Sequence, residues 1–502
     1  MSLDDKKKKE ILLEEKRKKR QEISFEKAKT KRKMILSGSV VQTIFAVCLP
    51  LFFYNLFNSF YGLVDSIMVA SINSSAVSAV SSLNQLKTLI ESVITGVGAG
   101  GAIIVSRRYG AGDLKEARKN ANVLVTLGLT ISFLLIVICV PFAVPIMELA
   151  NVPDSSITIG VGYFRVQMLM LALIAINTIY IGLEKAKGNT KLIFALNIIV
   201  MITKLFFTFL FVKVLNIQDV TWVAFATFIA QLVLFVIAIY ILTSKNNVLR
   251  VRIRELGLKW SYVYPILIIS LPIFLGKFVF SLGKVVVNGM CKIYGDLTVG
   301  ALGVSNSICG IITSPTNSFE EGESTMISQN LGNRNISRAM KIFKKTLLIS
   351  SLIGLFGYIL VRFIIQDQLI MLFNTGNNLE EAEQFVKMIE EIFKYDSLSI
   401  PALAVNAAVL GVLYGFGKTG LSMIINISRV FVFRVPILWY FKTFKPELGS
   451  KAAGISMGIS NICIMIMSIV VLIIFLISIK KNGYKGMHFG DPEPDVSELI
   501  IN

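Results

Sequence analysis

The sequence contains few of the residues on which most metal sites and catalytic centres depend. It has one histidine, His488, and its five cysteines include no closely spaced pair: Cys48, Cys139, Cys291, Cys309 and Cys463. Zinc, haem and iron–sulfur centres need clustered histidine or cysteine ligands, and Cys–His catalysis needs both residue types. The sequence also offers no phosphate-binding loop and no nucleophile–base pair. We therefore expect no metal, no cofactor and no enzymatic activity.

Acidic residues are scarce relative to basic ones. The 502 residues include 51 Lys and Arg but only 32 Asp and Glu, which gives a net charge of +19. A basic protein can bind nucleic acid, but here residues 1–33 supply +7 (14 basic, 7 acidic) and much of the remainder falls in short loops between apolar runs. That distribution is typical of a positive-inside membrane protein with a basic arm near anionic lipid. We expect membrane lipid as a partner, no nucleic acid, and a solvated or topogenic arm at residues 1–36.

Apolar sequence is abundant. Hydrophobic residues make up 54% of the chain, its mean hydropathy is +0.69, and apolar stretches of about 20 residues recur along it. These stretches are continuously apolar, whereas the strands of a membrane β-barrel alternate apolar and polar side chains. The predicted fold class is an all-α polytopic membrane protein. Twelve spans are expected, at residues 37–70, 76–105, 121–146, 160–183, 192–213, 221–243, 262–293, 297–327, 345–366, 396–416, 420–441 and 452–479.

The connections between these spans alternate in charge. Loops such as "SRRYGAGDLKEARKN" and "EKAKGNTK" are basic, whereas "MELANVPDSSITIG", "YGD" and "NTGNNLEEAEQ" contain no Lys or Arg. The positive-inside rule then places both termini in the cytoplasm, as an even number of spans requires. We expect a plasma (inner) membrane location. One connection disagrees, because residues 441–451 should face outward yet contain three lysines.

The chain repeats itself. Displaced by 222 residues, "SRRYGAGDLKEARK" (106–119) aligns without gaps with "SQNLGNRNISRAMK" (328–341), and Gly110 falls on Gly332. The same offset pairs Gly100 with Gly322, and a slightly longer offset of 229 aligns "GNTK" with "GKTG". Two six-helix lobes in the same orientation would be related by a pseudo-twofold axis along the membrane normal. The predicted divisions are an arm (1–36), an N-terminal lobe (37–243), a linker (244–261), a C-terminal lobe (262–479) and a cytoplasmic tail (480–502).

Five segments carry a resemblance to a known family: "LVDSIMVASINSSAVSAV" and "GVGAGGAIIVSRRYGAGD" in the first half, and "EEGESTMISQNLGNRN", "SIPALAVNAAVLGVLYGFGKTG" and "SRVFVFRVP" in the second. Together they resemble the multidrug and toxic compound extrusion (MATE) family, in its DinF-like branch. The resemblance covers residues ~45–440, nearly the whole membrane region. It implies a V-shaped exporter of twelve helices that expels organic cations or other amphiphiles in exchange for H⁺ or Na⁺. It also implies that Asp65 takes part in ion coupling.

Charged residues inside the spans of the first half are the candidates for ion coupling. Ionisable groups at membrane depth are costly and usually face a cavity or a partner. Asp65 lies ~40 Å along its helix from Ser37, near the outer mouth, so it is either an interfacial carboxylate or a coupling residue. Glu91 and Lys87 are one helical turn apart, and Lys204 is expected at the depth of Glu91. We predict a Lys87–Glu91–Lys204 charge group, with a purely structural ion pair as the alternative.

This region also departs from the family pattern. The Asn and Asp of the family's fifth helix fall on Lys204 and Thr208 here, so a second carboxylate of the N-terminal lobe is missing. A Na⁺ site needs several oxygen ligands, and the departure therefore favours proton coupling through Asp65 or Glu91. Lys204 could act as a fixed counter-charge or favour zwitterionic or anionic cargo. Asn197, which aligns with Asn426, is placed in the same predicted network.

Candidates for a substrate cavity occur in the second half. Lys277 and Lys284 share one helix face, and Glu320, which lies at a similar depth, is expected to pair with Lys277. Arg429 and Arg434 are interpreted as structural or lipid-facing residues. The full set of candidates is Lys277, Lys284, Asn288, Glu320, Glu321, Glu323 and Asn406. For the three glutamates, a gate or a structural ion pair is the alternative to substrate contact.

Three functions remain open at this point. The first is a monomeric secondary exporter of small amphiphilic or cationic molecules, coupled to H⁺ or Na⁺ and working by alternating access. The second is a flippase for lipids or lipid-linked saccharides, against which the glutamates at 320–323 count. The third is a non-transporting scaffold, which would have no need of charges at mid-depth in both halves.

Overall fold

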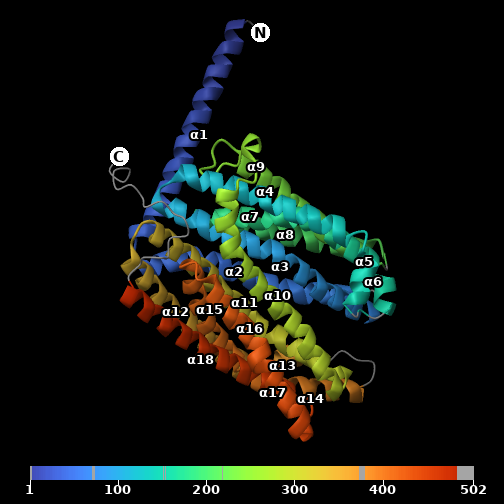
Figure 1. The fold of residues 1–502 in the computed structure, drawn as a ribbon. Coiled ribbons are helices and arrows are strands. Elements are labelled where there is room, and N and C mark those ends of the chain that lie inside the picture. Colours follow the sequence, from blue (N-terminus) through green and yellow to red (C-terminus); the bar gives the residue numbers. More distant parts are fainter. Residues whose placement is uncertain are drawn as a thin grey trace.

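The computed structural model describes residues 3–70, 74–150, 152, 154–217, 219–371 and 379–482, and nearly all of them are helical. The first half of the chain contains α1 (Leu3–Ser37), α2 (Val40–Ala70), α3 (Ser74–Ala111), α4 (Leu114–Cys139), α5 (Ala143–Leu149), α6 (Asp154–Leu169), α7 (Leu171–Ala186), α8 (Thr190–Phe209) and α9 (Thr221–Thr243). The second half contains α10 (Trp260–Cys291), α11 (Asp296–Gly332), α12 (Ile336–Ile359), α13 (Gln366–Met371), α14 (Leu379–Asp396), α15 (Ser399–Gly415), α16 (Thr419–Ile427), α17 (Val435–Phe444) and α18 (Lys451–Asn482). Figure 1 shows the two halves as two bundles that lie side by side.

The described helices account for twelve membrane spans. Ten helices are long and apolar enough to cross a membrane alone, and two bent pairs, α6–α7 and α14–α15, bring the number to twelve. The first pair bends by 47° and the second by 44°, and each is the fourth span of its half. Every predicted span overlaps one of these twelve, so the predicted all-α architecture of two six-helix lobes is confirmed.

Two glycines that the repeat aligns make reciprocal contacts between the lobes. A Cβ atom on Gly332 would lie 2.0 Å from the carbonyl oxygen of Arg107, and one on Gly110 would lie 2.1 Å from that of Gln329. Arg107 and Gln329 are themselves 222 residues apart, so each lobe makes the same contact with the other. Such reciprocity is the property expected of two lobes related by a pseudo-twofold axis.

The same relation recurs deeper in the interface. A Cβ atom on Gly100 of α3 would lie 2.7 Å from the Cα of Ser270 in α10, and one on Gly322 of α11 would lie 2.5 Å from the Sγ of Cys48 in α2. Gly100 and Gly322 are equivalent in the repeat, and so are Cys48 and Ser270. Glycine leaves room at Gly100 for the backbone of α10, and at Gly322 for the buried side chain of Cys48.

Hydrophobic packing divides the molecule into a closed end and an open end. One core combines residues of both lobes, such as Leu124 and Leu183 of the first with Ile266 and Leu413 of the second, and it lies towards the loops around 107–113, 184–191 and 329–335, which we call the closed end. Two further cores each belong to one lobe alone. They lie at the opposite, open end, where α5 and α6 stand apart from α13 and α14 (Figure 1). The lobes are therefore joined at one end only.

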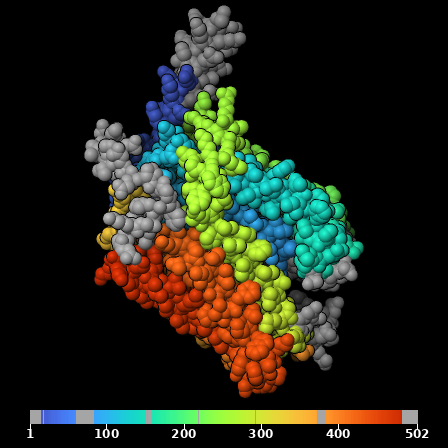
Figure 2. Space-filling model, in the orientation of Figure 1, coloured from blue at the N-terminus to red at the C-terminus, as the bar shows by residue number. Residues whose placement is uncertain are grey.

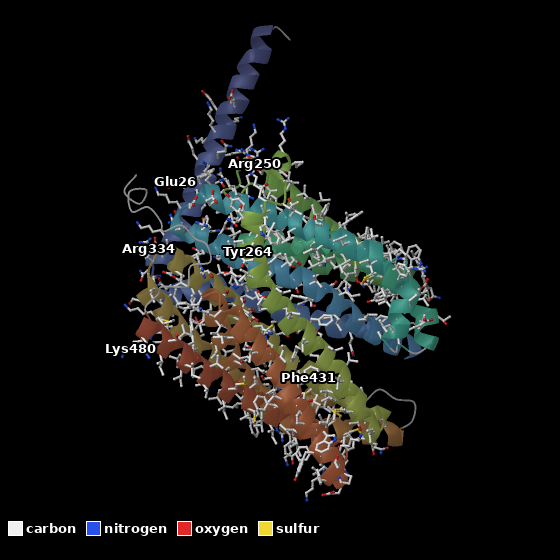
Figure 3. The ribbon with its side chains drawn as sticks, viewed as in Figure 1. Glu26, Arg250, Tyr264, Arg334, Phe431 and Lys480 are labelled. Carbon is white, nitrogen blue, oxygen red and sulfur yellow. The ribbon has the colours of Figure 1, made fainter. Side chains whose placement is uncertain are left out.

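Charged residues gather at the closed end. In Figure 3 the labelled Glu26, Arg250, Arg334 and Lys480 lie on that side of the molecule, whereas Phe431 lies farther towards the open end. The large apolar side chains that remain exposed lie mainly on the outer faces of the spans, for example Phe133 (64%), Phe206 (59%) and Phe356 (66%). Such side chains are suited to contact with lipid tails, as in other helical membrane proteins.

The basic arm is a helix that is partly attached to the body of the protein. Ser37, expected to begin the first span, instead ends α1, where its hydroxyl donates to the carbonyl oxygen of Lys33. The first span begins at Val40, after a break of two residues. Of the two alternatives for the arm, the solvated one is therefore wrong for its second half, and the topogenic one stays a prediction. The first half of α1 projects beyond the bundles, and α1 runs across the other helices instead of along them (Figure 1).

Hydrogen bonds tie the second half of α1 to both lobes and to the linker. On the N-terminal lobe, Arg32 Nη2 donates to the carbonyl oxygen of Gly110 (2.8 Å), and Lys31 donates to Asn189. On the linker, Ser24 Oγ donates to the carbonyl oxygen of Asn246 (2.7 Å). Burial lowers the pKa of the Lys31 ammonium, and the nearby carboxylate of Glu184 opposes this shift.

The C-terminal lobe holds the end of α1 through Arg338, with a longer hydrogen bond from Asn330 Nδ2 of α11 to the carbonyl oxygen of Ile35 (3.4 Å). Arg338 of α12 donates to the carbonyl oxygens of Ile35 (2.9 Å) and Gly38 (2.7 Å), at and just beyond the end of α1. The last carbonyl groups of a helix have no partner within the helix, and they carry its negative partial charge. The guanidinium of Arg338 supplies both the missing hydrogen-bond donors and a compensating positive charge.

We expect the Arg338→Ala variant to be less stable because it loses these charge-assisted hydrogen bonds, each worth about 1.5–3 kcal/mol. A fall of a few degrees in the melting temperature of the purified protein in detergent is the predicted result. Lys344→Ala, on an exposed position of the same helix, is the control and should melt like the wild type. Equal melting temperatures for all three proteins would contradict a stabilising role for this contact.

Candidate functional site: the cleft between the two lobes

The walls of the site are the surfaces of the two lobes that face each other towards the open end. Contacts between the lobes extend from the closed end as far as Asn55 of α2, whose Nδ2 donates to Ser318 Oγ of α11 (2.8 Å), and Gly96 of α3, which abuts Phe274 of α10. Beyond this level each lobe has its own core. Figure 2 shows the surface notched on this side, between the α5–α6 corner and the far end of α10. A cleft open at one end and floored by the shared core is the result.

The predicted Lys87–Glu91 pair lies on α3, in the N-terminal lobe. Lys87 Nζ lies 3.4 Å from Glu91 Oε1, one helical turn apart on α3, and each side chain is about one-fifth exposed. The pair lies between the level of Gly96 and the open end, because α3 runs from the open end towards Ala111 at the closed end. The structure therefore forms the ion pair, while its role in coupling stays a prediction.

The other candidates of the first half lie on α8 and α2 and differ in their surroundings. Lys204 is half-buried on α8. Thr208, one turn later, is fully buried, and its hydroxyl has no hydrogen-bond partner among the described residues. Asn197 is buried and donates to the carbonyl oxygen of Ile193 within its own helix (2.8 Å). Asp65 lies in α2, but outside the residues whose side chains the structure describes, so its role as a coupling residue stays a prediction.

The wall on the C-terminal side carries basic side chains. Lys277 and Lys284 of α10 are exposed, and Asn288 is half-buried. Seven residues correspond to two helical turns, so the two lysines share a face. Leu271, Leu282 and Val286, also exposed, lie on a different side of the same helix and are suited to lipid. Lys277 follows Phe274, which touches the N-terminal lobe, by one turn. The lysine face is therefore turned towards the cleft.

The predicted Lys277–Glu320 ion pair is wrong. In the described part of the chain, Glu320 and Lys277 form no ion pair within 4.0 Å; the neighbouring Glu321 pairs instead with Lys185 of α7, in the other lobe. The reason is that α11 lies at the interface between the lobes, so its exposed carboxylate reaches a lysine across the interface before one in its own lobe. Lys185 was not among the candidates, because the basic loop that contains it was used only to predict the orientation in the membrane.

Two candidates for the substrate cavity are buried inside the C-terminal lobe. Glu323 is fully buried and Asn406 is 3% exposed. A Cβ atom on Gly411 would lie 2.8 Å from Glu323 Oε2, so α15 approaches α11 too closely to leave space there. Neither residue lines the cleft in this conformation, which corrects their assignment. Lys277, Lys284, Asn288, Glu320 and Glu321 remain on or near its surface.

A buried polar network in the C-terminal lobe could not be found from the sequence pattern. Asp396, at the bend between α14 and α15, accepts hydrogen bonds from Ser305 Oγ (2.7 Å) and Ser399 Oγ (3.0 Å). Asn461 Nδ2 of α18 donates to Ser399 Oγ (2.7 Å) and its Oδ1 accepts from Arg429 (2.8 Å). Five separate helical segments meet here, and only the tertiary fold brings them together.

No group of three or more potential metal ligands occurs among His, Cys, Asp and Glu in the part of the chain that the structure describes. The chemistry of the cleft is that of fixed charges and apolar surface.

Comparison with known proteins agrees with this architecture. The MatE family matches residues 50–210 and 272–440, two segments that begin 222 residues apart, and together they make up more than half of the chain. The chain belongs to the MatE family. MatE proteins are transporters, so this membrane protein is a transporter and not an enzyme. The double match also confirms the internal repeat.

Two curated relatives and one solved structure illustrate the likeness. The probable multidrug resistance protein YoeA of Bacillus subtilis is 24% identical over 349 residues, 67% of this chain and 74% of that protein. The probable multidrug resistance protein NorM of Thermotoga maritima is 21% identical over 418 residues, 82% of this chain and 87% of that protein. A structure described as the outward-facing conformation of a multidrug resistance MATE family transporter superposes with a TM-score of 0.82, at 18% identity over 89% of this chain and 98% of that one.

Proposed function

We propose that this MatE transporter is a secondary exporter of small amphiphilic molecules, coupled to an inward flow of H⁺ or Na⁺. The observation that carries the proposal is the asymmetry of packing between two repeat-related lobes: one shared core at the closed end, and separate cores at the open end. Two lobes joined in this way can rock against each other, so that the open end closes and the closed end opens around a central site. This motion is alternating access. The names of the curated relatives, which are multidrug resistance proteins, favour amphiphilic cargo.

The orientation in the membrane follows from the charges. The closed end carries α1 and the basic loops, so under the positive-inside rule it faces the cytoplasm and the cleft opens outwards. The protein would then lie in the plasma (inner) membrane with both termini cytoplasmic. The DinF-like branch stays a prediction.

Transport in reconstituted vesicles tests the proposal. The protein is purified, reconstituted into liposomes, and given a fluorescent amphiphile together with an imposed pH gradient, an imposed Na⁺ gradient, or neither. We expect one gradient to drive accumulation at least about tenfold faster than no gradient, and the gradient that does so identifies the coupling ion. Accumulation that is equal under all three conditions would contradict a coupled exporter, and liposomes without protein serve as the control.

A further inference from the structure

The half of α10 that lies towards the open end carries a cationic group that the proposed mechanism does not use. Lys284 lies ten residues beyond Phe274, which abuts Gly96 of the other lobe, or ~15 Å further towards the open end. Its side chain is exposed on the face that it shares with Lys277, at an angle to Leu282 and Val286 on the lipid side. Lys284 therefore projects into the outer part of the cleft.

An aromatic ring links Lys284 to a second cation. Lys284 Nζ lies 4.9 Å from the centroid of the Phe280 ring, and Cζ of Arg429 lies 4.8 Å from the same centroid. Arg429 comes from the π-helical turn Ser428–Arg434 between α16 and α17, which packs against α10. Each cation is within the range of a cation–π contact. The ring thus holds two positive charges close together at the same level of the cleft.

These charges have no carboxylate of their own. Arg429 Nε donates to Asn461 Oδ1, a neutral amide, and the same oxygen accepts from Arg434 Nη2 (3.1 Å). Asp396 is the nearest acid of the network, and both of its oxygens accept from serine hydroxyls. Among the described residues neither Lys284 nor Arg429 forms an ion pair within 4.0 Å, whereas Lys87 and Lys185 on the opposite lobe both do. Positive charge at membrane depth is costly unless an anion compensates it.

We propose that Lys284, Arg429 and Phe280 form a subsite for an amphiphilic organic anion. A carboxylate, sulfonate or phosphate group would accept hydrogen bonds from the Lys284 ammonium and from the guanidinium nitrogens of Arg429 that are not bonded to Asn461. The apolar body of the ligand would lie along Phe280 and the apolar surface of α10. The inference rests on the proposed function and narrows its substrate class, because the basic wall of the cleft selects anionic over cationic amphiphiles.

Binding to the purified protein tests this subsite without any need for transport. The probes are three naphthalene compounds of similar size and different charge: 2-naphthalenesulfonate, 2-naphthylmethanol and 2-naphthylmethylammonium. Isothermal titration calorimetry in a neutral detergent measures each affinity. We expect the sulfonate to bind at least about tenfold more tightly than the alcohol, and the ammonium compound most weakly. Equal affinities for the three probes, or tighter binding of the ammonium compound, would overturn the proposal.

Substitutions locate the binding. Lys284→Gln should weaken sulfonate binding about tenfold or more, Lys284→Arg should restore it, and Phe280→Leu should weaken all three probes similarly. Lys259→Gln, an exposed lysine outside the cleft, is the matched control and should change nothing. Arg429→Gln should act like Lys284→Gln; its melting temperature is measured in parallel, because Arg429 also supports Asn461. Unchanged sulfonate binding in folded Lys284→Gln and Arg429→Gln proteins would place the anion elsewhere and refute the subsite.

The same chemistry could be supplied by an anionic lipid. Phosphatidylglycerol is therefore titrated in mixed micelles against phosphatidylcholine. Competition between phosphatidylglycerol and the sulfonate, lost in Lys284→Gln, identifies a lipid headgroup as an occupant; absence of competition identifies a soluble anion. Both results support the subsite, and they distinguish a lipid headgroup from a soluble anion as its ligand. Because binding is measured directly, failure of gradient-driven transport would count against the proposed function and leave this inference standing.

Discussion

Replacing Gly332 with valine should force the closed end apart. A Cβ atom at this position would lie 2.0 Å from the carbonyl oxygen of Arg107 and 3.0 Å from the backbone nitrogen of Ala111, so no side-chain rotation can relieve the clash. Overpacking of this kind typically costs 1–3 kcal/mol, or about a fivefold to 150-fold shift in a two-state equilibrium, and a backbone contact places it at the upper end. Folded protein should therefore populate a state in which the lobes are separated at this end.

Cys48 provides a native reporter of that separation. It is fully buried against Gly322 at the interface between α2 and α11, within the shared core. In a background where the other cysteines are replaced by alanine, its reaction with a membrane-impermeant maleimide should be about tenfold or more faster in Gly332→Val than in the parent protein. Gly110→Val, the repeat-related change, should behave in the same way.

Gly420→Ala is the matched control for both variants. Gly420 lies near the closed end, but a Cβ atom there would meet no atom within 4 Å. Labelling of Cys48 in this variant should match the parent protein. If Gly332→Val remained folded and its Cys48 stayed as protected as in the control, the closed end would not open through this contact, and the glycines would serve helix packing alone.

These glycines also show what the sequence could and could not specify. Gly110 and Gly332 were recognisable from the repeat, because both occupy the same place in two matching segments. The sequence could not show why these positions need glycine, because the need arises from the backbone of the opposite lobe, more than 200 residues away in the chain. The spans and the two lobes follow from local hydrophobicity and from duplication, and these predictions hold.

Among the charged residues, contacts within one helix could be predicted from the sequence, whereas contacts between helices could not. The Lys87–Glu91 pair was predictable because both residues lie on one helix, one turn apart. The partner of Glu321 was not, because depth along the membrane normal cannot say which of several lysines lies across an interface; Lys185 comes from the other lobe. Arg429, interpreted from the sequence as structural or lipid-facing, contacts Phe280 beside Lys284, and periodicity within one helix carries no information about such a contact between helices.

The conversion of Glu91 to glutamine should abolish ion-driven efflux. Glu91 is an ionisable carboxylate within the second span of the N-terminal lobe, and Oε1, the atom nearest Lys87, accepts no hydrogen bond among the described residues. A carboxylate in this position can exchange a proton as the transporter changes its access, whereas an amide cannot. Gradient-driven transport should fall by about tenfold or more, with unchanged abundance in the membrane. Asp65→Asn is expected to have a comparable effect, from its place in α2.

A double substitution separates coupling from simple charge balance. If the Lys87–Glu91 pair is only structural, the damage in Glu91→Gln comes from leaving Lys87 without its partner, and Lys87→Gln in the same protein should restore transport. If Glu91 couples the ion, the double variant Lys87→Gln/Glu91→Gln stays inactive although its charge is balanced, and Lys87→Gln alone keeps measurable efflux. The coupling role predicts the second pattern, because neutralising both residues removes the charge imbalance but does not return the group that carries the proton. Recovery of wild-type efflux in the double variant would show that Glu91 serves to balance Lys87 and would leave Asp65 as the coupling candidate.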